Sequence, residues 1–198
     1  REVDPRTVLT EAYSLGRDSA EIIARHLEEH ALTTFQVPDR DRILVEQIIG
    51  GPHPTYLITT CRGRGFNTAL GYFMAGLAEQ ASIPVIEMSF DENGLLLKTA
   101  QDVDPGAMYE AFSADNHMEV IERYIIGTQI FAKRFREVAG RSLIIPKRIG
   151  AEEISPQQFQ QRADALLNRH RTMDGSILIR EAKNEILYGD IDLGGLEQ

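Results

Sequence analysis

The sequence contains one short motif of the kind that binds a catalytic metal. His26 and His30 enclose Glu29 in the order H-x-x-E-H. On a helix, imidazoles four residues apart share a face and could both bind one Zn²⁺, with Glu29 activating a zinc-bound water. A zinc hydrolase also needs a third protein ligand, and no distant motif supplies one. The simpler interpretation is that both histidines lie on the polar side of an amphipathic helix.

A glycine-containing turn at residues 61–67 is a candidate phosphate site. Its sequence CRGRGFN should join a strand to a helix, where backbone N–H groups, Arg62 and Arg64 could bind phosphate. Asn67 could cap that helix or contact a sugar. The alternative is a structural turn in which the glycines supply positive φ and both arginines point into water. Cys61 has no orienting partner for nucleophilic catalysis and is expected to be a core thiol.

A basic segment stands out in an otherwise acidic chain. The 198 residues include 21 Lys and Arg against 30 Asp and Glu, and the net charge of −9 argues against a broadly basic nucleic-acid-binding face. Between residues 133 and 148, however, six basic side chains are accompanied by Glu137 alone. This segment could contact phosphates, or it could be a solvated face that pairs with acids elsewhere in the fold. The six are Lys133, Arg134, Arg136, Arg141, Lys147 and Arg148.

Composition indicates a globular protein. The hydrophobic fraction of 42% is close to the average for folded domains. No apolar run approaches the roughly 18 residues that span a bilayer, and the N-terminus does not resemble a signal peptide, so we expect a cytoplasmic protein with no membrane partner. The single cysteine, Cys61, cannot form an internal disulfide. Because the first residue is Arg1, we expect a fragment of a longer polypeptide.

The elements that would position these groups begin with helices. Asp4 and Pro5 are typical of a helix start. A second, amphipathic helix is predicted over residues 18–33, with Asp18 and Glu21 at the spacing of a capping box. Its expected apolar face consists of Ile23, Leu27 and Ala31.

At least four strands are predicted between residues 42 and 100. Apolar residues alternate over 43–49 and 56–60, which favours one hairpin, and segments 84–90 and 94–99 flank an Asn-Gly pair typical of another. A helix is predicted between the hairpins, with one large apolar face formed by Leu70, Phe73, Met74 and Leu77. A second face carries the small residues Gly71, Ala75 and Ala78.

The C-terminal half is predicted to be helical. A short helix should begin near Asp104, and a helical pattern extends over 117–139, interrupted at Gly127 and expected to end at Gly140. Its buried stripe should contain Phe131, Phe135 and Val138. Ser155 opens a further helix with a capping box, whose buried face should contain Phe159, Ala163 and Leu166, and a last helix is expected over about 176–188. The fold class is therefore α+β, with a small antiparallel or mixed sheet flanked by helices.

Three stretches, in this order, carry a resemblance to a known family. They are residues 59–70 (TTCRGRGFNTAL), 135–143 (FREVAGRSL) and 178–187 (LIREAKNEIL), the last followed by Asp192 and Leu193. They resemble the C-terminal accessory, DEAD/H-associated domain of Lhr-type (large helicase-related) superfamily 2 helicases. The middle stretch is the most specific. The resemblance covers residues 36–193, which leaves 1–35 as a helical lead-in to a single accessory domain.

The resemblance implies an accessory role within a helicase. In the family this domain follows two motor domains and a winged helix, and helps to enclose a translocating single strand. The motor residues are absent from this chain, so it should neither hydrolyse ATP nor unwind a duplex by itself. We expect ATP and Mg²⁺ to bind the parent helicase, and no catalytic residue, cofactor or metal in this fragment.

The expected partners are single-stranded DNA or RNA and the motor and winged-helix domains of the same parent chain. The candidate nucleic-acid contacts are Arg62, Arg64, Asn67, Arg134, Arg136, Arg141, Lys147 and Arg148. Two alternatives remain open besides the zinc hydrolase. The domain could be a purely structural module that docks on motor domains through an apolar face, and Arg136 or Arg141 could pair with Glu181 or Glu185 instead of with phosphate.

Overall fold

The computed structural model describes most of the chain and divides it into two compact units. The described residues are 4–34, 36, 42–112, 117–146, 148–149, 152–173, 175–189 and 191. The first unit spans Arg1–Leu44 and the second Val45–Gln198.

The first unit consists of two helices that pack on each other. Helix α1 spans Pro5–Glu11 and helix α2 spans Arg17–Thr34. The predicted helix start is confirmed, because the Asp4 carboxylate accepts a hydrogen bond of 3.2 Å from the Arg6 N–H. On α2 the small side chains of Ala20 and Ala24 are buried, whereas Ile23 and Leu27 are 39% and 38% exposed. The expectation of a buried Ile23 and Leu27 was wrong, because the face that packs is the one with the smallest side chains.

The helices of the first unit are joined by Arg6. Its guanidinium donates from Nε to the Glu21 carboxylate at 2.7 Å and from Nη1 to the Glu28 carboxylate at 2.7 Å. These hydrogen bonds lower the pKa of Glu21 and Glu28 below the ordinary value and raise the pKa of Arg6. Glu21 therefore binds across to α1, and α2 begins at Arg17, so the capping box predicted for Asp18 and Glu21 was wrong.

The second unit contains a four-stranded sheet, as predicted. The strands are β1 (Leu44–Ile48), β2 (Thr55–Thr59), β3 (Val85–Phe90) and β4 (Gly94–Thr99), in the order β1-β2-β4-β3. Both neighbours of β4 run antiparallel to it, with Leu57 opposite Leu96 and Met88 opposite Leu97. The predicted Asn-Gly hairpin between β3 and β4 is confirmed. Asp91 stabilises its turn, because the carboxylate accepts from the N–H groups of Asn93 and Gly94 at 2.8 and 2.9 Å.

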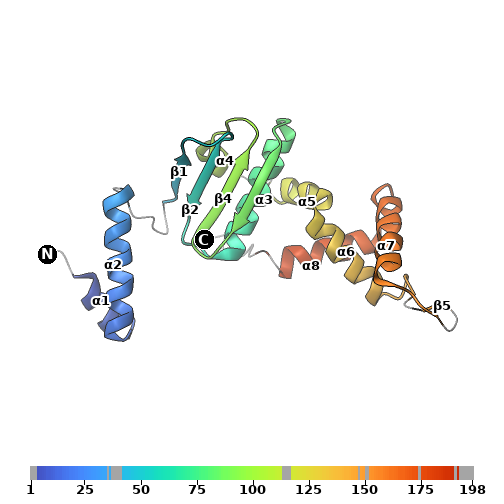
Figure 1. Cartoon of the computed structure of the whole chain (residues 1–198), viewed down its shortest axis with the longest axis horizontal. Helices are drawn as coiled ribbons and strands as arrows, with labels where there is room; N and C mark the ends of the chain where they lie inside the picture. Colours follow the sequence, from blue (N-terminus) through green and yellow to red (C-terminus); the bar gives the residue numbers. More distant parts are fainter. Residues whose placement is uncertain are drawn as a thin grey trace. The chain divides into compact units, whose positions relative to one another are not determined.

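Helix α3 (Arg64–Gln80) lies along one face of the sheet (Figure 1). Helices α4 (Pro105–Phe112) and α5 (His117–Gly127) also pack on it, so nearly every residue from Phe66 to Ala78 is buried. Its small residues allow this close contact. A Cβ at Gly71 would lie 2.3 Å from the Phe90 ring, and one at Gly76 would lie 2.7 Å from the Val120 side chain.

Helices α6 (Gln129–Arg141), α7 (Pro156–Arg171) and α8 (Ile177–Gly189) form the remainder (Figure 1). Two-residue strands β5 (Arg148–Ile149) and β6 (Glu152–Glu153) pair between α6 and α7. The predicted interruption is confirmed, since α5 ends at Gly127 and Thr128 caps α6 by accepting from the Phe131 N–H at 3.1 Å. The predicted stripe of Phe131, Phe135 and Val138 is buried. Gly140 does not end the helix, which continues to Arg141, and positive φ occurs at Leu143 instead.

Replacing Gly94 by alanine should destabilise the sheet. The added Cβ would lie 2.1 Å from the Ile58 carbonyl oxygen, which belongs to a backbone that cannot move independently of β2. We expect a loss of about 1–3 kcal/mol or more in the free energy of unfolding, measured by urea denaturation. Gly127→Ala is the control, because a Cβ there meets nothing within 4 Å. Equal midpoints for the two variants would contradict the close approach seen at Gly94.

The Arg6 contacts should make the first unit sensitive to acid. Because the folded pKa values of Glu21 and Glu28 are lowered, their stabilising contribution is complete above the ordinary carboxyl pKa of 4.5 and is lost as the pH falls through the lowered values. A carbon-13 NMR titration should show both carboxyls titrating below 4.5. In Arg6→Gln both should return toward the ordinary value. Identical titrations in the two proteins would refute the assignment.

Candidate nucleic-acid interface

Asn67 holds together three segments of the second unit and is not available to a ligand. Its side chain is 0% exposed. The amide oxygen accepts from the Thr60 hydroxyl at the end of β2, and the amide nitrogen donates to the Asp91 carbonyl of the β3–β4 turn at 2.9 Å. Gly63, with φ of +86°, is the N-cap of α3. The expectation that Asn67 caps the helix or contacts a sugar was therefore wrong, because both of its polar ends are satisfied inside the protein.

The two arginines of the same turn have different surroundings. The Arg62 guanidinium lies over the Phe66 ring, 4.9 Å from the ring centroid. Arg64 is exposed at the first turn of α3, and its backbone N–H donates to the Glu92 carboxylate at 3.2 Å. The Glu92 carboxylate thus already occupies the positive, N-terminal end of the α3 dipole, which is the position predicted for a phosphate. Cys61 is exposed with φ of +54°, so the expectation of a core thiol was wrong.

The basic segment on α6 is divided between two neighbouring helices. Toward α8, Arg134 and Arg141 share the Glu185 carboxylate, with Arg134 Nε 3.9 Å from it. Arg134 also donates to Glu137 at 3.0 Å. The alternative prediction that Arg141 pairs with Glu185 is therefore confirmed. Arg134 and Arg141 can reach the same carboxylate because they lie two turns apart on one side of α6.

Toward α7, Arg136 Nη1 lies 3.5 Å from the Asp164 carboxylate. Its partner is thus on α7, not Glu181 or Glu185 of α8 as the alternative proposed. Arg148 is exposed in β5, opposite Glu153 of β6. Lys147 lies outside the described residues, so its predicted phosphate contact stays a prediction.

A groove of about 550 Å³ separates α6 from the first turn of α7. Three cations and one carboxylate line it, together with the half-exposed ring of Phe159. Sequence periodicity placed Phe159 in the buried face of α7, but the buried residues there are Ala163 and Leu167. We call this the α6–α7 groove; its lining is Lys133, Arg136, Glu137, Gly140, Arg141, Pro156, Phe159 and Gln160. Neither Arg62 nor Arg64 belongs to the lining of this groove.

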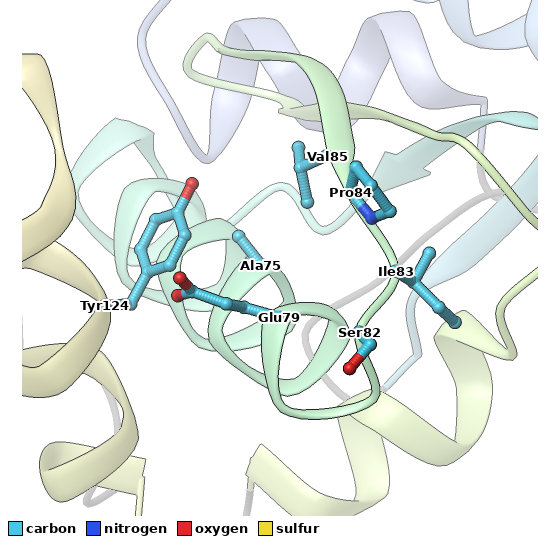
Figure 2. A pocket seen from close by; sticks show the side chains of 7 residues that line it. All are labelled: Ala75, Glu79, Ser82, Ile83, Pro84, Val85 and Tyr124. Atoms are coloured by element: carbon cyan, nitrogen blue, oxygen red, sulfur yellow. The ribbon is translucent and has the colours of Figure 1, made fainter.

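A second concave site, which sequence reasoning missed, lies at the other end of α3. Its volume is about 370 Å³. Figure 2 shows the Tyr124 ring of α5 beside the Glu79 carboxylate of α3, with Pro84 and Val85 across the opening. Burial, and then the nearby Glu79 charge, raise the pKa of Tyr124. We call this the Glu79 pocket; Ala75, Ser82 and Ile83 complete its lining.

The histidine motif finds no third ligand in the described part of the chain. The rings of His26 and His30 share one side of α2, with centroids 6.5 Å apart, and Glu29 is exposed. Among the described residues, no three His, Cys, Asp or Glu side chains are grouped to hold a metal ion. The zinc hydrolase hypothesis is thus unsupported there. Of the helices described, none combines the length and apolar character needed to cross a bilayer.

Comparison with known proteins gives consistent matches. The family model described as DEAD/H associated matches residues 37–198. An ATP-dependent helicase Lhr-Core protein 2 of Thermococcus barophilus is 25% identical over 193 residues, which are 96% of this chain and 22% of that protein. An ATP-dependent helicase Lhr-Core of Saccharolobus solfataricus is 25% identical over 173 residues, covering 84% of this chain and 20% of that protein. This chain thus spans about a fifth of those relatives' length.

The fold is shared with a solved helicase structure. The structure of Mycobacterium smegmatis helicase Lhr bound to ssDNA and AMP-PNP matches with a TM-score of 0.80 and 21% sequence identity. The match covers 98% of this chain and 25% of that one. This chain therefore has the fold of about a quarter of that longer chain.

Proposed function

The chain belongs to the DEAD/H associated family, and on that premise we propose that it is an accessory domain of a longer Lhr-type helicase that contacts single-stranded DNA or RNA. The names of the relatives and the bound ssDNA of the solved neighbour support this assignment. In this proposal, ATP and Mg²⁺ bind the motor domains of the longer chain. The observation that carries the proposal is the α6–α7 groove, whose lining has three cations against one acid.

The cations of the groove retain capacity for phosphate. Arg141 uses one guanidinium nitrogen for Glu185 while its side chain stays 62% exposed, and Arg136 uses one for Asp164. A guanidinium has five N–H donors, so several remain. Exposed ion pairs contribute only about 0–1 kcal/mol, and a phosphate can therefore compete with or join them. Lys133 is exposed on the same side of α6.

The overall charge is consistent with a supporting role. A net charge of −9 disfavours strong binding by the isolated domain, because a chain of net negative charge repels the negatively charged strand. A local basic groove can still position a strand that other domains already hold. The proposal keeps Arg136 and Arg141 as phosphate contacts and adds Lys133, which also lines the groove. Arg64 and Arg148 remain exposed cations outside the groove, and the buried Asn67 is excluded.

Removing two groove cations should weaken binding and its salt dependence. For a single strand, log affinity falls against log salt with a slope of about −0.7 per neutralised phosphate, so three contacts give about −2. In Lys133→Gln/Arg141→Gln we expect weaker binding and a slope shallower by about 1.4. Fluorescence anisotropy of the 198-residue chain with oligo-dT and oligo-rU measures both.

Lys98→Gln is the matched control, because Lys98 lies on β4 and pairs with Glu87 outside the groove. It should leave the slope unchanged. The double variant removes the Arg141 partner of Glu185 but leaves its Arg134 partner. Unfolding midpoints of the unchanged chain, the double variant and Lys98→Gln check that this loss does not destabilise the fold. Binding that does not depend on salt, or an unchanged slope in the double variant, would refute the assignment.

A second candidate function, docking within the longer chain, is favoured by the Glu79 pocket. Most of its lining side chains are apolar, and no ion pair of the Glu79 carboxylate is found among the described residues. Charge complementarity points to a Lys or Arg side chain of a motor or winged-helix domain as the occupant. The stem of such a side chain would pack on Tyr124 and its cation would meet Glu79.

Reversing the charge at this pocket should separate docking from nucleic-acid binding. We expect Glu79→Lys to weaken binding of the chain to a motor and winged-helix fragment by about tenfold or more in calorimetry, because a shielded charge pair is replaced by repulsion. Oligonucleotide affinity should not fall. Glu110→Lys, an exposed acid on α4, is the control. If both variants lose affinity for the fragment equally, the pocket is not the docking site.

A further inference from the structure

Phe159 is an aromatic side chain that the fold leaves half-buried in a groove lined by several charged residues. The large aromatic side chains Phe66, Phe73, Phe112, Phe131 and Phe135 are fully buried, as the hydrophobic effect favours. Phe159 is instead only half-buried, and it lies among the cations of the α6–α7 groove.

The position of the Phe159 ring is fixed from two sides. Ser155 and Gln158 form a capping box, with hydrogen bonds of 3.2 Å in both directions, which sets the first turn of α7. The Phe159 N–H donates to the Ser155 carbonyl at 2.9 Å. Gly140 of α6 receives the tip of the ring, since a Cβ there would lie 3.1 Å from Phe159 Cζ. The ring is therefore held at its tip by backbone, with part of its surface open to the groove.

The groove combines the two kinds of contact that a single strand offers. Aromatic rings stack on bases with little sequence preference, whereas Lys and Arg attract phosphates. Lys133, Arg136 and Arg141 line the groove on the α6 side, and Gln160 beside Phe159 carries an amide that can donate to or accept from a base edge. Glu137 is the acid of the lining, and it already accepts from Arg134.

We infer that Phe159 stacks on one nucleobase of a strand whose phosphates lie along Lys133, Arg136 and Arg141. This inference rests on the proposed function and specifies its base contact. A stacking platform explains why a large apolar ring is held at its tip but only half-buried, and why Gly140 gives it room. It also supplies the base contact in a chain that has no tryptophan.

The experiment compares Phe159→Leu, which keeps an apolar side chain but removes the aromatic face, with the unchanged 198-residue chain. The ligands are oligo-dT and an abasic strand of the same length. The unchanged chain should bind oligo-dT about 5- to 150-fold more tightly than the abasic strand. Phe159→Leu should lose most of that preference and keep the salt slope, since the phosphate contacts remain. Tyr188→Leu, an exposed aromatic on α8 outside the groove, should behave like the unchanged chain.

Phe159→Trp gives a second readout that does not depend on a loss of binding. It would be the single tryptophan of the chain, so its fluorescence reports this site alone. Stacking predicts quenching by oligo-dT, little quenching by the abasic strand, and affinity at least equal to that of the unchanged chain.

Four results would overturn the inference. If Phe159→Leu retains the preference for oligo-dT over the abasic strand, the ring does not stack, while salt-dependent binding would leave the proposed function intact. If Phe159→Leu binds both strands equally weakly, with a shallower salt slope, the ring only shapes the groove. If it loses affinity for a motor and winged-helix fragment instead, the ring is a protein-docking contact. Absence of salt-dependent binding by the unchanged chain would refute the proposed function as well.

Discussion

The second unit depends on the burial of α3 on nearly all sides. A helix can be buried in this way only if the elements around it approach its backbone closely, and Gly71 and Gly76 permit that approach to Phe90 and Val120. Polar contacts also hold α3 against the sheet. Asn67 forms hydrogen bonds from inside the core with Thr60, next to the end of β2, and with Asp91 in the β3–β4 turn. An unsatisfied buried amide costs about 1–3 kcal/mol, so these contacts fix the start of α3 relative to the sheet.

The candidate interface follows from a similar constraint on α6. Its phenylalanine stripe must be buried, and α7 and α8 cover it from two directions. The remaining surface of α6 therefore faces α7 on one side and α8 on the other. Its arginines form ion pairs with acids on both helices, Arg136 with Asp164 on α7 and Arg141 with Glu185 on α8. The same residues thus help to hold the helices and line the groove. A signature sequence at this point is consistent with both packing and ligand contact.

The distribution of charge also follows from the tertiary structure. Three arginines of the basic segment share the acids Glu137, Asp164 and Glu185, so the field is weaker than the local count of charges indicates. Exposed pairs of this kind are readily exchanged for phosphate. In the proposed function, such a groove would guide a strand held by other domains and would capture one poorly by itself.

The sequence by itself determined the α+β class, the four strands, the break after Gly127 and the cap at Ser155, because these depend on periodicity and on neighbours a few residues away. It also located the basic segment. Only the tertiary structure decided the burial of Asn67, the partners of Arg136 and Arg141, and the incomplete burial of Phe159. The arginine partners lie 28 and 44 residues away in the chain, and their proximity depends on how three helices pack. Helical periodicity indicates which residues share a face of a helix. Whether that face is buried depends on how the neighbouring helices pack against it.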